Sequence, residues 1–400
     1  MTRLRVYDDT RALFHLPDGV IYLDGNSLGA LPLGVAERVN RVITEEWGNE
    51  LIRAWNSAGW YVQPRHLGDR IARLIGADAG SVMVGDTLSL KVYQALAAAL
   101  DMSVSRKVIL SDTGNFPTDL YMAEGLIATL GRGHQLRLVA PEEIEHALSE
   151  EIAVLYITEV DYRTGRRHDM AKLTAKAHAL GIVTVWDLAH SAGALPVDLA
   201  GSGADFAAGC TYKYLNAGPG APAFLYVAPR HADGARAALS GWMGHAKPFA
   251  FELAYASAGG VERMRVGTPP VLAMAALEAS LDIWDKVDIA EVRARSLALG
   301  DLLIGEVERR CPQLKLVTPR DHELRGSQVS FAFAGGYAAM QALIARGIVG
   351  DFRAPDIMRF GLTPLYIGES EIVRAAEIIE EVISGEVWRR PEYQVVHAVT

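Results

Sequence analysis

The chain has 400 residues, of which 50% are hydrophobic and 22% charged, a composition typical of a soluble globular protein with two domains. The net charge of −9 argues against a nucleic-acid backbone as a partner. The first residues lack the apolar core of a signal peptide, and no apolar run reaches the roughly 18 residues of a membrane span, so we expect a cytoplasmic protein. Two cysteines, Cys210 and Cys311, are too few for a disulfide framework, and we expect both to be reduced thiols.

Apolar strands and helical stretches alternate through the first two thirds of the chain. The expected strands cover residues 81–84, 107–111, 136–140, 152–158, 183–186, 206–209 and 223–227, with helices at 88–100, 118–130, 141–150 and 170–180. Because these strands are continuously apolar and are separated by helices, they predict a mostly parallel sheet covered on both faces. Ligands of such sheets bind outside the carboxyl ends of the strands.

The pattern changes beyond about residue 270. Helices are expected at 271–286 and 288–310, followed by shorter strands at 315–317 and 328–333. We therefore predict a small α+β domain over residues 269–400, a large domain over 31–268 and an N-terminal segment, 1–30, that packs with the small domain.

An acid and an amine follow two of the predicted strands. Asp187 comes directly after the strand at 183–186, and Lys213 lies just beyond the strand at 206–209. A lysine can form a Schiff base with pyridoxal phosphate, and a carboxylate can hold the pyridine nitrogen of that cofactor protonated. Taken singly, Asp187 could instead be a helix N-cap and Lys213 a solvated surface charge.

Other residues after the strands could complete such a site. Residues 85–89 join a strand to a helix, and the helix N-terminus with the Ser89 hydroxyl could bind a phosphate, although a plain capping turn is an equal alternative. Phe116 could stack on a cofactor ring and Asp119 could bond its polar groups or simply cap a helix. His190 lies three residues after Asp187 and could pack on the ring or orient the carboxylate.

The patterns of other catalytic sites are missing from the sequence. No His-Glu-x-x-His or paired Cys-x-x-Cys motif occurs, so no metal site is expected. No Gly-x-Ser-x-Gly motif marks a nucleophilic serine, and Gly218-Pro-Gly220 lacks the third glycine of a dinucleotide-binding loop.

A set of motifs spread over nearly the whole chain resembles a known family. Two of them are specific: Asp24-Gly-Asn-Ser-Leu-Gly29 and Tyr212-Lys-Tyr-Leu-Asn216. The others lie at residues 46–48, 55–60, 116–119, 187–193, 241–249, 267–269 and 359–366. On these motifs the chain resembles the kynureninases, which are pyridoxal 5′-phosphate enzymes of fold-type I, the aspartate aminotransferase-like class.

The resemblance implies a fold, a reaction and an assembly. The fold is the α/β fold of fold-type I transferases, with a mostly parallel central sheet flanked by helices in the large domain and a smaller α+β C-terminal domain. The reaction is the hydrolytic cleavage of the Cβ–Cγ bond of L-kynurenine to anthranilate and L-alanine in tryptophan degradation. The assembly is a homodimer with the site at the subunit interface. Thr268 mildly favours kynurenine over its 3-hydroxy derivative.

The resemblance also implies residue roles. Lys213 would form the Schiff base and move protons, Asp187 would pair with the pyridine nitrogen, and Tyr212 would donate or accept protons. Arg359 would pair with the substrate α-carboxylate, since a guanidinium binds a carboxylate through two parallel hydrogen bonds. The remaining cofactor ligands would be Leu88, Ser89, Phe116, Asp119, Thr158, His190, Trp242 and Thr268, of which the last two could come from the partner subunit. Trp55 and Trp60 are candidates to contact the aryl ring.

The main alternative is another enzyme of the same fold. A cysteine desulfurase or a class V aminotransferase would share the lysine and the aspartate but would run different chemistry. Asp86 and Lys91 stand where related sequences often have asparagine, and residues 367–369 depart from the expected continuation after Tyr366. These departures leave the Asp187–Lys213 pair untouched and bear on the choice of substrate.

Overall fold

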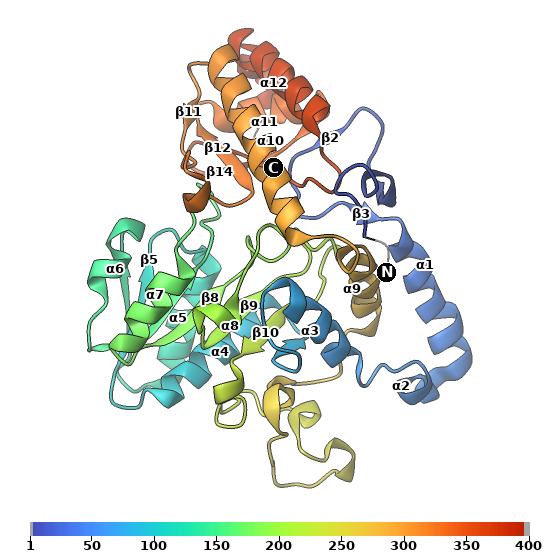
Figure 1. Cartoon of the computed structure of the whole chain (residues 1–400), viewed down its shortest axis with the longest axis vertical. Helices are drawn as coiled ribbons and strands as arrows, with labels where there is room; N and C mark the ends of the chain where they lie inside the picture. Colours follow the sequence, from blue (N-terminus) through green and yellow to red (C-terminus); the bar gives the residue numbers. More distant parts are fainter. Residues whose placement is uncertain (1–2, 396–400) are drawn as a thin grey trace.

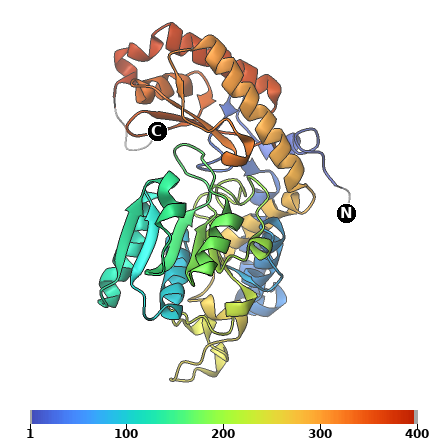
Figure 2. The same ribbon diagram turned by 60° about the vertical axis from the view of Figure 1, so that its left-hand side comes forward.

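The computed structural model describes residues 3–395 of the chain. A large domain with a central sheet lies below a smaller domain formed by the C-terminal third of the chain, which is orange and red in Figure 1. Figure 2 shows the same two layers from the side, with the long helix α10 (Ile289–Arg310) running along the small domain. No helix among residues 3–395 has the length and apolar character needed to cross a bilayer.

The large domain is built on a seven-stranded sheet with the order β4-β10-β9-β8-β7-β5-β6. Four consecutive pairs, from β9 to β6, are parallel, and only β10 runs against its neighbours β9 and β4. The predicted mostly parallel sheet is therefore confirmed. The strands are β4 (Val82–Val84), β5 (Val108–Asp112), β6 (Gln135–Val139), β7 (Ile152–Thr158), β8 (Val183–Asp187), β9 (Phe206–Gly209) and β10 (Phe224–Val227).

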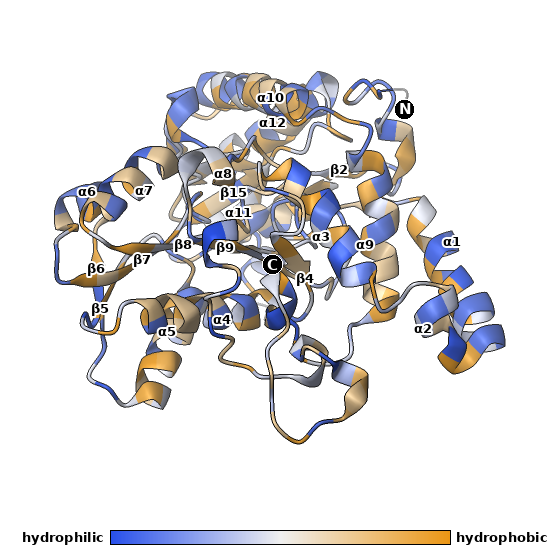
Figure 3. Ribbon diagram, turned by 60° about the horizontal axis from the view of Figure 1, so that its bottom comes forward, coloured by the Kyte–Doolittle hydropathy of each residue, from blue (hydrophilic) through white to orange (hydrophobic). Residues whose placement is uncertain are grey.

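Helices bury both faces of this sheet, which explains why its strands are continuously apolar. Leu155 and Ile157 of β7 belong to one core, whereas Val154 and Tyr156 belong to the core on the opposite face. Figure 3 shows α7 on one side of the apolar strands and α4 and α5 on the other. The helices of this domain are α3 (Gln63–Leu74), α4 (Leu88–Met102), α5 (Pro117–Leu130), α6 (Ile144–Ala147), α7 (Met170–Ala179) and α8 (Leu199–Ser202), and α9 (Val271–Trp284) packs on α3.

The helix expected at 141–150 is shorter in the structure. A 3₁₀ turn over Pro141–Glu143 precedes α6, and Leu148 is already extended, with φ −65° and ψ 124°. The acidic first turn that suggested a helix is present, but the helix is too short to carry the whole predicted segment.

The small domain contains an antiparallel sheet with the order β11-β12-β15-β14, covered by helices. Helices α10 and α12 pack together, and α11 packs on α12. Besides α10, its elements are β11 (Lys315–Leu316), β12 (Gln328–Ala332), α11 (Gly336–Ile344), β13 (Ile348–Val349), β14 (Asp351–Arg353), β15 (Ile357–Gly361) and α12 (Glu369–Ser384).

The N-terminal segment runs from the small domain to the loop that carries Lys213. Its strand β2 (Ile21–Tyr22) pairs in parallel with β13, and the Gly29 amide donates a hydrogen bond of 2.7 Å to the carbonyl of Tyr212. A Cβ atom at Gly29 would lie 2.3 Å from the carbonyl oxygen of Lys213, so only glycine allows this approach. The domain boundaries at residues 30 and 268 stay a prediction. The other N-terminal elements are β1 (Phe14–His15), β3 (Leu31–Pro32), α1 (Gly34–Arg41) and α2 (Ala54–Ser57).

Candidate active site

The carboxyl edge of the large sheet opens into a cavity of about 190 Å³. Strand ends supply Thr158 and Asp187, and the loop after β9 supplies Lys213. Most of the predicted site residues line this one cavity. The lining consists of Leu88, Phe116, Thr158, Asp187, His190, Tyr212, Lys213 and Arg359, together with Asn26, Ser27, Tyr162, Ala189 and Arg353.

Lys213 is the amine at the centre of the cavity. Its Nζ lies 3.0 Å from His190 Nε2 and 6.0 Å from the centroid of the Phe116 ring. Burial, and then the charge of Lys213, hold the pKa of His190 well below its ordinary value, so the imidazole is neutral. Nε2 of the neutral imidazole accepts a hydrogen bond from the lysine and so positions the amino group without placing a second positive charge beside it.

Asp187 is a buried carboxylate without a full set of partners. Its Oδ1 accepts a hydrogen bond of 2.7 Å from the amide of Ala189. Burial raises the pKa of Asp187, whereas the charge of Lys213 lowers it. Asp119 lies beside it, and burial, followed by the charge of Asp187, raises the pKa of Asp119 well above its ordinary value. Two neighbouring buried carboxyl groups of this kind favour a nearby cation or a shared proton.

The residues present fit pyridoxal phosphate. Asp119 Oδ2 and His190 Nδ1 are buried and have no hydrogen-bond partner among the residues that the structure describes. Leu88 and Ser89 begin α4, where helical amides have no partner within the helix and favour an anion. Phe116 is 41% exposed beside the lysine, so part of its ring is accessible for stacking. The cavity thus offers an anion cradle, an aromatic face, a carboxylate and an amine.

Several predicted residues lie outside the cavity lining. Asp119 sits behind Asp187, and Ser89 is half-buried in the first turn of α4. Trp242 is 40% exposed and packs edge-on against Phe249 at 5.7 Å, while Thr268 is exposed. The single chain therefore does not bring Trp242 or Thr268 to Lys213.

The two tryptophans considered for the aryl ring pack against each other. The ring centroids of Trp55 and Trp60 are 6.1 Å apart, and Trp60 Nε1 donates a hydrogen bond of 2.7 Å to Glu46 Oε2. Trp60 belongs to a small separate core, and neither ring lines the cavity of the described chain.

The sequence reasoning missed four polar or aromatic cavity residues. Asn26 and Ser27 lie in the specific Asp-Gly-Asn-Ser string, which was used only to identify the family. Tyr162 follows β7, and its ring meets that of Phe116 edge-on at 5.1 Å. Arg353 lies two residues after Asp351 on β14, a spacing that places both side chains on one face of the strand.

Arg359 is buried and already engaged in the structure. Its Nε donates a hydrogen bond of 2.8 Å to Asp351 Oδ1, and its Nη2 contacts Asp351 Oδ2 and lies 2.8 Å from Ser27 Oγ. Its Nη1 donates to the carbonyl of Tyr162. The guanidinium is thus fixed in place at the rim of the cavity.

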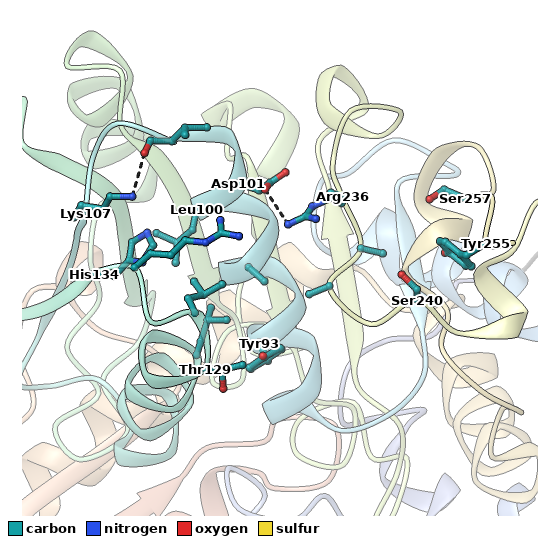
Figure 4. A pocket seen from close by; sticks show the side chains of 17 residues that line it. Tyr93, Leu100, Asp101, Lys107, Thr129, His134, Arg236, Ser240, Tyr255 and Ser257 are labelled. Atoms are coloured by element: carbon teal, nitrogen blue, oxygen red, sulfur yellow. Dashed lines mark hydrogen bonds and ion pairs between the residues drawn. The ribbon is translucent and has the colours of Figure 1, made fainter.

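A larger cavity of about 590 Å³ lies elsewhere, between α4, α5 and residues 236–257 (Figure 4). Its lining includes Lys107 and His134, which precede β5 and β6, so this cavity lies at the amino end of the sheet. Arg236 pairs there with Asp101 at 3.0 Å. None of the predicted site residues lines this cavity, so volume alone does not locate the chemistry.

The thiols and the metal-binding side chains offer no second centre. Both cysteines are free and buried, and burial raises the pKa of Cys311 to about 11 and that of Cys210 above its ordinary value. A desulfurase needs an accessible nucleophilic cysteine, which neither residue provides. No cluster of three or more His, Cys, Asp or Glu side chains suited to a metal occurs within residues 3–395.

Comparison with known proteins matches the chain to one family. The family model described as the kynureninase C-terminal domain matches residues 292–379. A kynureninase from Pseudomonas fluorescens is 51% identical over 397 residues, which is 98% of this chain and 95% of the relative. A kynureninase from Burkholderia pseudomallei (strain 1106a) is also 51% identical over the same shares.

Solved structures share the fold at low sequence identity. An apo cysteine desulfurase from Thermococcus onnurineus NA1 matches with a TM-score of 0.79 and 19% identity over 96% of this chain and 100% of that chain. A mutant of C-DES with glycine covalently linked to its pyridoxal phosphate cofactor matches with a TM-score of 0.78 and 18% identity, over 93% and 99%. These identities establish the fold-type I architecture alone. The full-length relatives decide the family, and the chain belongs to the kynureninases, with pyridoxal 5′-phosphate as cofactor.

Proposed function

We propose that the protein hydrolyses the Cβ–Cγ bond of L-kynurenine, giving anthranilate and L-alanine in tryptophan degradation. The observation that carries this proposal is the convergence of Lys213, Asp187 and Arg359 on one cavity in a chain 51% identical to kynureninases. Pyridoxal phosphate, when bound, supplies an electron-accepting ring conjugated to the substrate α-carbon.

The chain would hold the cofactor through three groups. Lys213 would bind it covalently, Asp187 would pair with the protonated ring nitrogen, and the first turn of α4 would accept the phosphate. The ion pair with the ring would relieve the cost of burying Asp187, whose pKa is raised by that burial.

Proton transfers would be shared by Lys213 and Tyr212. The Lys213 amine would remove the proton from the substrate α-carbon. Burial raises the pKa of Tyr212, so its hydroxyl stays protonated and could donate a proton to Cβ, which becomes the methyl group of L-alanine. Their atoms are close, since Lys213 Nζ lies 5.8 Å from the centroid of the Tyr212 ring.

We further propose a homodimer that completes the site. Residues 242–258 project from the large domain as the arm at the bottom of Figures 1 and 2, and Phe251 and Leu253 on it are 75% and 106% exposed. An exposed apolar arm of this size supports burial against a second copy. The same arm carries Trp242, and Thr268 follows it, so both could reach the cavity of the partner subunit. We propose the cytoplasm as the location, supported by the two unpaired cysteines.

The test is a fluorescence assay for anthranilate with purified, cofactor-loaded protein. Wild type should release anthranilate from L-kynurenine, Lys213→Ala should lose that activity, and Lys172→Ala, which removes a surface amine, should keep it. A parallel assay with 3-hydroxy-L-kynurenine measures the preference that Thr268 suggests. Absence of product from either substrate at high enzyme concentration would reject the proposed reaction.

A further inference from the structure

Arg359 has little capacity left for a substrate carboxylate. Hydrogen bonds to Asp351, Ser27 and the carbonyl of Tyr162 use four of its five N–H groups. A second carboxylate could not form the usual pair of parallel hydrogen bonds with this guanidinium unless Asp351 were displaced. Asp351 is itself 1% exposed, and displacing it would leave a buried charge without its partner.

Strand pairing places a second arginine beside the first. Asp351 of β14 lies directly opposite Arg359 of β15, and Arg353 follows two residues later on the same face. Arg353 Nη2 lies 2.7 Å from Asp351 Oδ2, the oxygen that also receives Arg359 Nη2, and 3.3 Å from Ser27 Oγ. Asp351 therefore holds both guanidinium groups side by side.

Arg353 retains more free donors than Arg359. Its other hydrogen bond within residues 3–395 goes from Nη1 to the carbonyl of Phe352, at 3.1 Å, which leaves its Nε unengaged. Its side chain is 32% exposed and lines the cavity of Lys213. The charges of both arginines also help to lower the pKa of His190, whose imidazole contacts the Lys213 amine. The two arginines therefore lie close to the lysine.

The charges of this cluster leave it positive. Two guanidinium groups face one carboxylate, that of Asp351. Asp24 also lies near, and burial, followed by the charge of Asp351, raises its pKa to about 7, so it is only partly ionised at neutral pH. An anion that reaches the two guanidinium groups therefore meets more positive than negative charge.

We propose that the substrate α-carboxylate binds to Arg353 as well as to Arg359, with Asp351 as the positioning residue that aligns the two. Arg353 then becomes a specificity-determining residue that selects substrates with a free carboxylate. This inference rests on the proposed reaction, because it concerns the substrate of that same cavity.

The test compares Arg353→Gln and Arg353→Lys with wild type and with Arg374→Gln, a control on the exposed face of α12. Losing a charged hydrogen bond should raise KM for L-kynurenine by about ten- to a hundredfold and change kcat by less than about threefold, with Lys less severe than Gln. The inhibition constant of the amine analogue that lacks the α-carboxylate should be the same in all four proteins. A merely structural defect would weaken binding of both compounds.

A spectral titration of the holoenzyme with L-alanine gives a readout that does not need kynurenine turnover. Its dissociation constant should rise in both Arg353 variants by a factor similar to the rise in KM. Unchanged KM and alanine affinity in an active Arg353→Gln protein would overturn the inference while leaving the reaction intact. If wild type binds alanine but does not cleave kynurenine, the proposed function is rejected instead. If Arg353→Gln does not fold, Arg353→Lys takes its place in both measurements.

Discussion

Two buried carboxylates lie at opposite edges of the large sheet, one at β8 and one at β9. Their hydrogen bonds and pKa shifts are opposite in character. Asp205 directly precedes β9 at the amino edge, whereas Asp187 is the last residue of β8 at the carboxyl edge. They are equally buried, each 3% exposed. Their hydrogen-bond partners and their pKa shifts differ in the way expected if Asp205 is structural and Asp187 binds the cofactor, as we propose.

Asp205 is fully satisfied. It accepts hydrogen bonds from His178 Nε2 at 2.8 Å, His231 Nε2 at 2.7 Å, Arg230 Nη2 at 2.6 Å and the Thr184 amide at 2.8 Å. Burial alone would raise its pKa, but the bonds from His231 and His178 outweigh burial and lower it. The ionised form is therefore stabilised by the fold itself.

Asp187 has fewer hydrogen-bond partners than Asp205. It has a single backbone hydrogen bond, its neighbour Asp119 has an unpartnered oxygen, and burial raises the pKa of both. A buried carboxylate with a raised pKa lacks a cation that a ligand can supply. Asp187 at the carboxyl edge thus lacks the direct hydrogen bonds from basic side chains that Asp205 has at the amino edge.

The largest effect should come from removing the charge of Asp187. Asp187→Asn should lower kcat by a factor on the order of 10² to 10⁴, because the ring nitrogen would lose its ionic partner. Steady-state anthranilate assays measure the loss. The cofactor-free protein should be no less stable than wild type, since the fold gains nothing from ionising Asp187; clear destabilisation in denaturant would place Asp187 with the structural carboxylates.

The same substitution at the other edge should act on stability. Asp205→Asn should lower the free energy of unfolding by about 2–4 kcal/mol, because it leaves the buried donors around it poorly matched. Urea denaturation of the cofactor-free protein measures the change. In the folded variant kcat should stay within a few fold of wild type, and a loss as large as that of Asp187→Asn would break the contrast.

Acid should reduce the stability that the ionised Asp205 contributes. The pKa of Asp205 is lowered in the folded chain, so its contribution to stability is present above its unfolded pKa of roughly 3.9 and is lost as pH falls through the folded value. The stability difference between wild type and Asp205→Asn should therefore hold from pH 6 to about pH 4 and shrink below it, as measured by urea titrations at roughly pH 6, 4 and 3. A constant difference would mean that Asp205 acts through packing and not through its charge.

The smallest effect is expected from the thiols. Replacing Cys210 and Cys311 together by serine should leave kynurenine cleavage within about twofold of wild type, because both thiols are buried and have raised pKa values. Enzyme activity at matched cofactor occupancy is the measurement. A loss of activity of a hundredfold or more in a folded protein would indicate that a cysteine takes part in the chemistry.

The sequence predicted the parts of the site that follow from local pattern. Strands β7 and β9 have the predicted bounds, and Asp187 and Lys213 line one cavity because Asp187 ends β8 and Lys213 follows the adjacent parallel strand β9. A continuous apolar strand ending in a polar residue is a local signal, and the edge at which such residues gather follows from the sheet being parallel.

The parts that were missed depend on contacts between distant segments. Ser27 reaches the cavity because β2 pairs with β13, and Arg353 reaches it because β14 pairs with β15. Neither pairing is readable from strands of two or three residues. Trp242 and Thr268 lie away from the lysine in one chain, so their roles stay a prediction that depends on a second copy.

The identity of the lysine that holds the cofactor is the claim to test most directly. Lys91, in the first turn of α4, is fully buried and is paired at 2.9 Å with Asp86, which precedes that helix. Borohydride reduction of the holoenzyme, followed by peptide mapping with mass spectrometry, should find the pyridoxyl phosphate label on the peptide that contains Lys213. A label on Lys91 or on any other lysine, or no covalent label on a protein that retains its cofactor, would contradict the proposed site.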